Sequence, residues 1–103
     1  MQEMRVSGRK RRRYRVKLGP ISAYTTDVSG GGFCTEVMRV LPPRTAVEGA
    51  IEVDGKPVPF EGVIAWVARG AWHLNVRGRM GVRFTRIAPD AARLFDPRSA
   101  AMV

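Results

Sequence analysis

The sequence predicts an all-β domain: a small antiparallel barrel capped by one short helix near the C-terminus. In most segments the apolar residues recur at every second position, which is typical of strands with one face in a core. Turn dipeptides rich in Gly and Pro separate these segments, and a helical pattern occurs only near residues 89–96. A chain of 103 residues forms one domain and can fold without disulfides or metal. Six or seven short strands followed by a helix describe such a capped barrel.

The most regular strand pair lies in the middle of the chain. Ile51 and Val53 alternate with Glu52, so one face of this strand is predicted to be buried. Asp54-Gly55 follows, a dipeptide that favours the positive φ angles of a two-residue hairpin. The second strand continues the alternation with Val58, Phe60, Ile64 and Trp66.

Further strands are expected at residues 16–18, 21–28, 33–37, 72–76 and 80–84. Gly19-Pro20 ends the first of them, and Pro42-Pro43 marks a loop. In the helix near residues 89–96, Pro89 suits the first turn and Asp90 suits the positive end of the helix dipole.

Positive charge is concentrated at the N-terminus. Residues 1–17 contain eight Lys or Arg and one Glu, so they supply +7 of the formal net charge of +9. Most of it lies in the run Arg9-Lys10-Arg11-Arg12-Arg13-Tyr14-Arg15. Such a density of like charge indicates an anionic partner. We expect residues 1–15 to form a flexible basic arm, residues 16–98 the barrel with its helix, and residues 99–103 a tail.

Several functional classes are disfavoured. Cys34 and His73 are the only Cys and His of the chain, which excludes an internal disulfide and a Cys/His metal cluster. His73 has no evident nucleophile or orienting acid, which argues against an enzyme. The sequence has no apolar segment of about 20 residues and no signal-peptide pattern. We therefore expect a cytoplasmic protein without metal, cofactor or membrane partner.

The segment Asp27-Val28-Ser29-Gly30-Gly31-Gly32 is a candidate binding motif at the end of a predicted strand. Asp27 and Ser29 are two positions apart, so they share one face of the strand while Val28 faces the core. The glycines permit unusual backbone angles and close approach of a flat ligand to the main chain. The same pattern is common in ordinary hairpin turns, where Asp and Ser bond to backbone donors.

A carboxylate and several guanidinium groups on one surface suit a guanine nucleotide. Arg donates hydrogen bonds to O6 and N7 of guanine and to phosphate oxygens. The Asp27 carboxylate can accept hydrogen bonds from the guanine N–H groups. Taken alone, the arginine run is more typical of a solubilising tail or a non-specific nucleic-acid patch than of a nucleotide site.

With these two motifs the chain resembles PilZ domains, the bacterial receptors for cyclic di-GMP. The Arg-x-x-x-Arg signature of that family falls on Arg11 and Arg15, because Arg15 directly precedes the apolar Val16. Arg12 matches an extra arginine often found beside the first. The Asp/Asn-x-Ser-x-x-Gly signature falls on Asp27, Ser29 and Gly32. The resemblance implies that these residues bind cyclic di-GMP.

The resemblance extends over residues 9–96 and implies a six-stranded antiparallel barrel with a C-terminal helix. Residues 62–66 and 80–84 are similar to two strands of the family. The resemblance suggests that Trp66 stacks on a guanine, whereas its place in the alternation favours a core position equally. The chain departs from the family in its first hairpin. Only eleven residues separate Arg15 from Asp27, so the opening strands must be short or partly missing.

The resemblance implies a non-catalytic receptor in which ligand binding orders the arm and thereby signals to a protein partner. Two alternatives remain open. The first is a nucleic-acid-binding protein that uses its basic arm. The second is a PilZ-like scaffold that binds no nucleotide and acts through protein contacts, which the short first hairpin favours.

Overall fold

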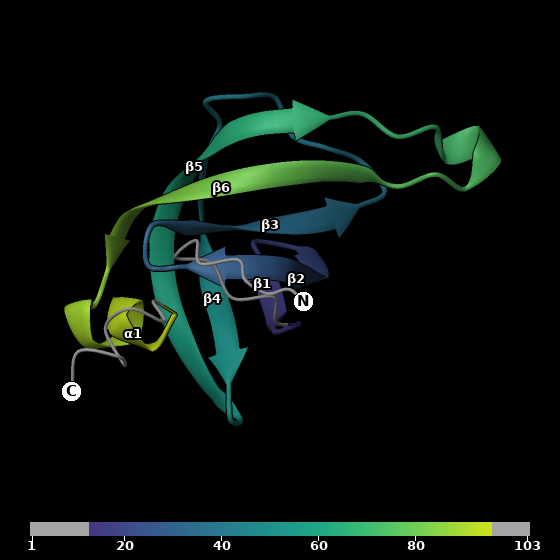
Figure 1. Cartoon of the computed structure of the whole chain (residues 1–103). Helices are drawn as coiled ribbons and strands as arrows, with labels where there is room; N and C mark the ends of the chain where they lie inside the picture. Colours follow the sequence, from purple (N-terminus) through teal and green to yellow (C-terminus); the bar gives the residue numbers. More distant parts are fainter. Residues whose placement is uncertain (1–12, 96–103) are drawn as a thin grey trace, which may run out of the picture.

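The structure, a computed structural model, describes residues 13–95. Six antiparallel strands close into a barrel in the order β1-β2-β3-β6-β5-β4 (Figure 1). The elements are β1 (Arg15–Leu18), β2 (Ile21–Ser29), β3 (Gly32–Val37), β4 (Ala46–Val53), β5 (Lys56–Ala68), the 3₁₀ helix η1 (Trp72–Leu74), β6 (Gly78–Ile87) and α1 (Pro89–Leu94). The predicted fold class, a six-stranded barrel with one C-terminal helix, is confirmed.

Two tight hairpins set the register of the barrel. Asp54 and Gly55 have φ angles of 51° and 80°, as the predicted two-residue turn between β4 and β5 requires. Gly19, with φ of 58°, begins the short turn between β1 and β2. Although β1 has only four residues, it pairs with β2 on one side and with β4 on the other. The first hairpin is therefore short, as expected, and the barrel is complete.

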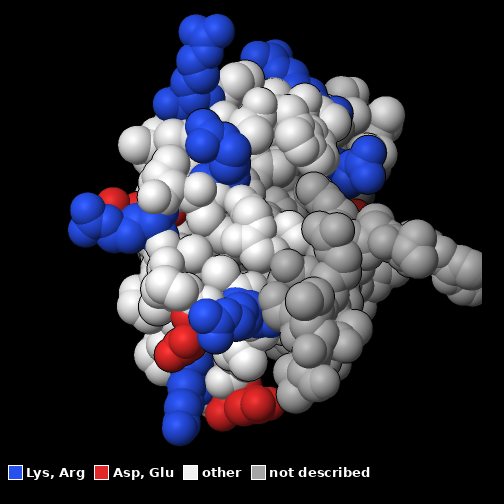
Figure 2. Space-filling model, turned by 60° about the vertical axis from the view of Figure 1, so that its left-hand side comes forward, with Lys and Arg blue, Asp and Glu red and all other residues white. Residues whose placement is uncertain are grey.

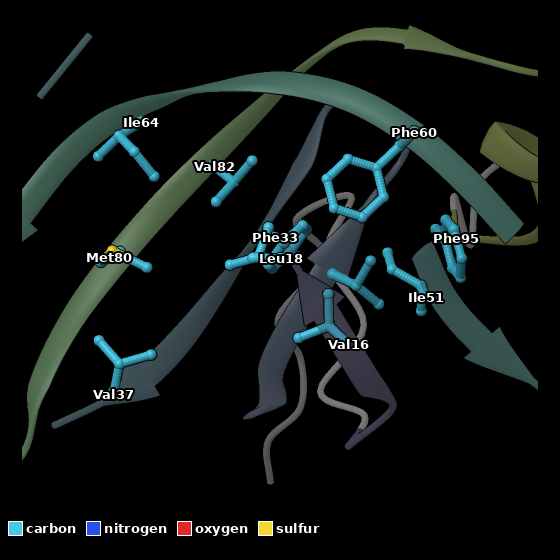
Figure 3. Close-up of a cluster of buried hydrophobic side chains, with 11 residues drawn as sticks. Val16, Leu18, Phe33, Val37, Ile51, Phe60, Ile64, Met80, Val82 and Phe95 are labelled. Atoms are coloured by element: carbon cyan, nitrogen blue, oxygen red, sulfur yellow. The ribbon is translucent and has the colours of Figure 1, made fainter. Parts of the chain in front are cut away.

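Aromatic rings fill the centre of the barrel. The ring centroid of Phe33 lies 5.4 Å from that of Phe60 and 5.9 Å from that of Phe84. Ile51 and Met80 are fully buried in the same cluster, and Figure 3 shows Phe33, Ile51, Phe60 and Met80 pointing into the barrel from β3, β4, β5 and β6. Such edge and tilted ring contacts stabilise a core beyond the area they bury.

The helix α1 closes one end of the barrel (Figure 1). Pro89 lies in its first turn together with Asp90, so both predicted start signals are in place. Phe95, directly after the helix, is completely buried. Its ring meets the ring of Tyr14 at 5.6 Å, and this contact links the beginning of the described chain to its end.

The prediction of a strand at residues 72–76 is wrong. The segment forms η1 and a single bridge between Ala71 and Val76. The Ala71 N–H donates to the Val76 carbonyl at 2.8 Å, and the Leu74 N–H donates to the Ala71 carbonyl at 2.8 Å. Asn75 has a φ of 59°, which interrupts an extended strand. Leu74 and Val76 are not buried, since Leu74 is 67% exposed and Val76 51%.

Candidate functional site

The β2–β3 hairpin presents Asp27 and Ser29 on the outer surface of the barrel. Val28 between them is fully buried, whereas Asp27 and Ser29 are half-buried. A β-bulge between Thr25 and Asp27 lets Thr25 and Val28, three positions apart, both point inward. The two polar side chains therefore share one face, as the sequence predicts.

Ser29 also stabilises the turn of this hairpin. Its Oγ accepts a hydrogen bond from the Gly31 N–H at 3.3 Å and lies 3.5 Å from the Gly32 carbonyl oxygen, to which it can donate. This is the local pattern of an ordinary Ser-containing turn. Ser29 thus has a structural role that is independent of any ligand.

Gly32 is required by strand packing. A Cβ atom at this position would lie 2.0 Å from the carbonyl oxygen of Val82 on β6. Among the glycines of residues 13–95, positive φ angles occur at Gly19 and Gly55, and not in the glycine run at 30–32. The expectation that this run supplies unusual backbone angles is therefore wrong, and Gly32 instead allows β3 and β6 to approach closely.

One row of paired residues crosses the outer face from β2 to β5. Asp27 pairs with Cys34, Cys34 with Gly81, and Gly81 with Trp66. Residues that are paired across neighbouring strands point to the same face of a sheet. At a strand spacing of about 4.8 Å, the Asp27 and Trp66 backbones are separated by roughly 14 Å. Between them lie the small side chain of Cys34 and Gly81, against which the Trp66 indole packs.

Trp66 belongs to this outer row because of a second bulge, between Ile64 and Trp66 on β5. Without the bulge, Trp66 would face the core together with Ile64, as strict alternation predicts. Instead the indole is 39% exposed and lies against Gly81, where a Cβ atom would be 2.0 Å from the Trp66 Nε1. The alternative of a core position is thereby excluded. Bulges often redirect a side chain in this way next to functional sites.

Arg15 stands on β1 on the outer surface of the barrel. Its Nη2 donates to the Tyr24 hydroxyl at 3.4 Å, and its Nε lies 3.8 Å from Glu52 Oε1. The Tyr24 hydroxyl, with the nearby Glu52 carboxylate, raises the pKa of the Arg15 guanidinium. Arg13 covers the same Tyr24 ring, with its Cζ 4.9 Å from the ring centroid.

The arginine-bearing segment enters the barrel alongside the strand that bears Asp27. The Thr25 N–H donates to the Tyr14 carbonyl at 2.8 Å, and the Tyr14 N–H donates to Thr25 Oγ1 at 2.9 Å. Arg13 to Arg15 therefore run beside residues 24 and 25 of β2, immediately before Asp27. Arg11 and Arg12 lie outside the described residues.

Arg83 is a candidate that the sequence argument missed. It pairs with Gly32, which pairs with Ser29, so the exposed Arg83 occupies the row next to that of Asp27 and Trp66. The alternation of Met80 and Val82 indicates that Arg83 faces outward. Only the pairing of β3 with β6 places it beside the Asp27 motif.

The basic side chains of the described residues are dispersed on the face that Figure 2 shows. There the blue side chains stand apart from one another around an uncharged area. Within residues 13–95 no group of His, Cys, Asp and Glu could hold a metal ion, and no helix has the length and apolarity to cross a bilayer.

Together these features define a small closed barrel with Asp27, Ser29 and Trp66 on its outer wall. The family model for the PilZ domain matches residues 2–96, and the chain belongs to this family. PilZ domains are generally non-catalytic receptors for cyclic di-GMP.

A solved structure of the Bacillus subtilis inhibitor of motility MotI/DgrA has the same fold, with a TM-score of 0.76 and 13% sequence identity. The match covers 98% of this chain and 52% of that protein, so the chain spans about half of its length. A search of the curated proteins found no match.

Proposed function

We propose that this PilZ domain binds cyclic di-GMP across the outer face of β2, β3, β6 and β5 and relays the signal to a protein partner. The observation that supports this most directly is the row from Asp27 to Trp66. It puts a carboxylate and an exposed indole on one face, with small residues between them. The arginine segment enters beside the same edge.

Each residue has a role that fits its chemistry. The Asp27 carboxylate accepts hydrogen bonds from the N–H groups of a guanine edge, and Trp66 offers a flat face on which a base can stack. Arg15 donates to phosphate oxygens, for which the planar guanidinium is well suited. Arg83 is placed to add a second guanidinium from β6. In this proposal Arg11 and Arg12 complete the arginine contacts, Ser29 donates from beside Asp27, and Gly32 lets β3 lie close to β6 at this end of the hairpin.

Arg15 is available to a phosphate at little cost. Its contacts with Tyr24 and Glu52 are made at the surface, where its side chain is 56% exposed and that of Glu52 48%. Exposed ion pairs of this kind contribute little to stability because water competes for both partners. A phosphate that accepts two guanidinium hydrogen bonds can therefore replace the Glu52 carboxylate.

The signal in this proposal is the ordering of the basic segment that precedes residue 13, because Tyr14 and Arg15 are already held against β2. A basic segment loses conformational entropy when it is fixed, and charge-assisted hydrogen bonds to the ligand offset this loss. Ligand binding then changes the surface that the arginine segment offers to a protein partner. The protein acts as a receptor and adaptor, without a catalytic step.

Calorimetric titration of the full chain tests the ligand class. Cyclic di-GMP, cyclic di-AMP and a short DNA duplex are compared at two salt concentrations. We expect cyclic di-GMP to bind most tightly with a modest salt dependence, since few charges take part. Preference for the duplex, with affinity falling steeply as salt rises, would support the nucleic-acid alternative instead. Absence of binding by all three would support the ligand-free scaffold.

Trp66→Ala is expected to weaken binding of cyclic di-GMP about tenfold, because stacking of a base on an aromatic ring contributes about 1–3 kcal/mol. Gly81→Ala should weaken it too, since the added Cβ displaces the indole from its place. Leu74→Ala, at another exposed apolar residue, on η1, serves as the control and should leave affinity unchanged. Wild-type affinity in Trp66→Ala would exclude the stacking role.

A further inference from the structure

We propose that a groove along β2 and β3 docks an extended segment of a partner protein that has acidic residues at one end and apolar residues at the other. This segment would belong to the protein partner of the receptor. The effect of cyclic di-GMP on its binding therefore rests on the proposed function. The groove consists of two adjoining hollows of about 420 and 660 Å³, which share Ser22, Glu36 and Arg77. We call it the β2–β3 groove.

One half of the β2–β3 groove is cationic. Arg13, Arg15 and Arg77 surround the smaller hollow, and Glu36 is the acidic residue among its lining. Tyr24, 44% exposed, forms the floor on which Arg13 lies. Three guanidinium groups around one hollow are complementary to carboxylates, which they can bind in a bidentate manner.

The other half of the β2–β3 groove is mainly apolar, although Arg39 also lines it and Glu36 and Arg77 are shared with the cationic half. Met38, Val40 and Leu41 line the larger hollow together with Ile21, and Met38 is 49% exposed. The side chains of Ile21, Val40 and Leu41 pack against the core, so the core holds this side of the groove in place. An exposed apolar hollow next to charged residues is typical of a protein-binding surface.

The wall formed by the β3–β4 connection is held in place by hydrogen bonds. The Arg44 N–H donates to the Ile64 carbonyl at 2.7 Å, and the Thr45 hydroxyl donates to the Pro42 carbonyl at 2.6 Å. The Leu41 N–H lies 3.2 Å from Met80 Sδ. A preformed wall lowers the entropic cost of binding a peptide.

The occupant must be held by side chains. The six strands of residues 13–95 close on themselves, so a peptide finds no free strand edge for main-chain pairing. The five residue steps from Ile21 to Thr26 along the groove span roughly 17 Å, which corresponds to an extended peptide of about five residues. Charge and apolar contact at its two ends then fix its direction.

The β2–β3 groove shares Arg15 with the proposed cyclic di-GMP site. A nucleotide that engages Arg15, and with it the arginine segment, removes positive charge from the cationic half. Nucleotide and peptide should therefore weaken each other's binding by the same factor, as thermodynamic linkage requires. In this scheme cyclic di-GMP releases the partner.

Fluorescence anisotropy with labelled pentapeptides and the full chain tests the proposal. The panel contains Asp-Asp-Glu-Leu-Leu, its reverse Leu-Leu-Glu-Asp-Asp, the charge-reversed Lys-Lys-Arg-Leu-Leu, the polar Asp-Asp-Glu-Ser-Ser and a single-stranded DNA pentamer. We expect one of the two acidic-apolar peptides to bind with a Kd in the micromolar range and at least tenfold more tightly than the other controls. Failure of both, or equal binding of the charge-reversed peptide or the DNA, would overturn the proposal.

Matched variants test whether the peptide binds in the β2–β3 groove. Arg77→Glu and Met38→Asp should each weaken the peptide at least tenfold and leave cyclic di-GMP affinity unchanged. Arg93→Glu and Leu94→Asp, at exposed positions of α1, are the corresponding controls and should bind the peptide normally. Peptide binding that tolerates Arg77→Glu would contradict the groove.

Saturating cyclic di-GMP tests the regulatory part and should raise the Kd of the peptide. If the peptide binds and cyclic di-GMP does not, the groove stands and the proposed function fails. If both bind without affecting each other, the coupling through Arg15 is refuted.

Discussion

Asp27→Ala is expected to lower the affinity for cyclic di-GMP by about a hundredfold or more, which removes measurable binding under ordinary conditions. The carboxylate accepts from two guanine N–H groups in the proposed complex, and each charge-assisted hydrogen bond contributes about 1.5–3 kcal/mol. Asp27 stands on the outer face and is half-buried, whereas the neighbouring Val28 supplies the core contact. The fold should therefore persist, with circular dichroism and the melting temperature close to those of the wild type.

Arg15→Ala should have a similar effect on affinity through loss of the phosphate contact. Two substitutions serve as controls for charge alone. Arg5→Ala removes a cation outside the arginine signature, and Asp90→Ala removes an exposed carboxylate on α1. Both should change affinity little in the same calorimetric titration. Wild-type affinity in Asp27→Ala or Arg15→Ala would refute the site.

Phe33→Ala is expected to have the largest effect on stability, a loss of about 3–5 kcal/mol in the free energy of unfolding. Phe33 is 1% exposed and its ring contacts the rings of both Phe60 and Phe84. Its removal leaves a cavity at the centre of the barrel. The hydrogen-bonded strands of a closed barrel cannot move inward to fill it. Because small domains have about 5–15 kcal/mol of total stability, this loss is a large part of it.

Urea denaturation monitored by tryptophan fluorescence measures this effect. Leu74→Ala, which shortens a side chain 67% exposed on η1, should change the unfolding free energy by less than about 0.5 kcal/mol. A loss of less than about 1 kcal/mol in Phe33→Ala would show that the three aromatic rings are not the centre of the core.

The features that local sequence determines were predictable. Asp54-Gly55 specifies its hairpin through the positive φ angles of both residues, which few other dipeptides adopt. The alternation around Ile51 fixes which face of β4 is buried, and Pro89 and Asp90 mark the start of α1. Each of these signals acts within a few residues, so no knowledge of strand pairing is needed.

Neither the positions of the bulges nor the conformation of residues 72–76 could be predicted from local sequence. A bulge adds one residue to a strand without a distinctive sequence signal, and the bulge before Trp66 reverses the face on which the indole lies. At residues 72–76 the apolar alternation favours a strand, but Asn75 adopts a left-handed conformation and the segment bonds to itself. An alternation of apolar residues indicates a strand only where one face is buried, and Leu74 and Val76 remain largely exposed.

The composition of the candidate site depends on which strands are neighbours. The motifs identified Asp27, Ser29 and Arg15 from the sequence, and the structure puts the Arg15 segment beside β2. Arg83 and the small residues Cys34 and Gly81 join the site only through the pairing of β3 with β6. Gly32 illustrates the converse, since a residue of the binding signature is also required by contact with the Val82 carbonyl.

The most direct test of the proposed site is a titration of the isotopically labelled protein with cyclic di-GMP, followed by amide chemical shifts. The site predicts that the largest changes fall on Asp27 to Gly32 of the β2–β3 hairpin and on Gly81 to Arg83 of β6. Amides of residues 46–48 of β4, at the other end of that strand from the Arg15–Glu52 contact, should change little. Largest changes on β4 or on η1, with the β2–β3 hairpin unaffected, would contradict the account.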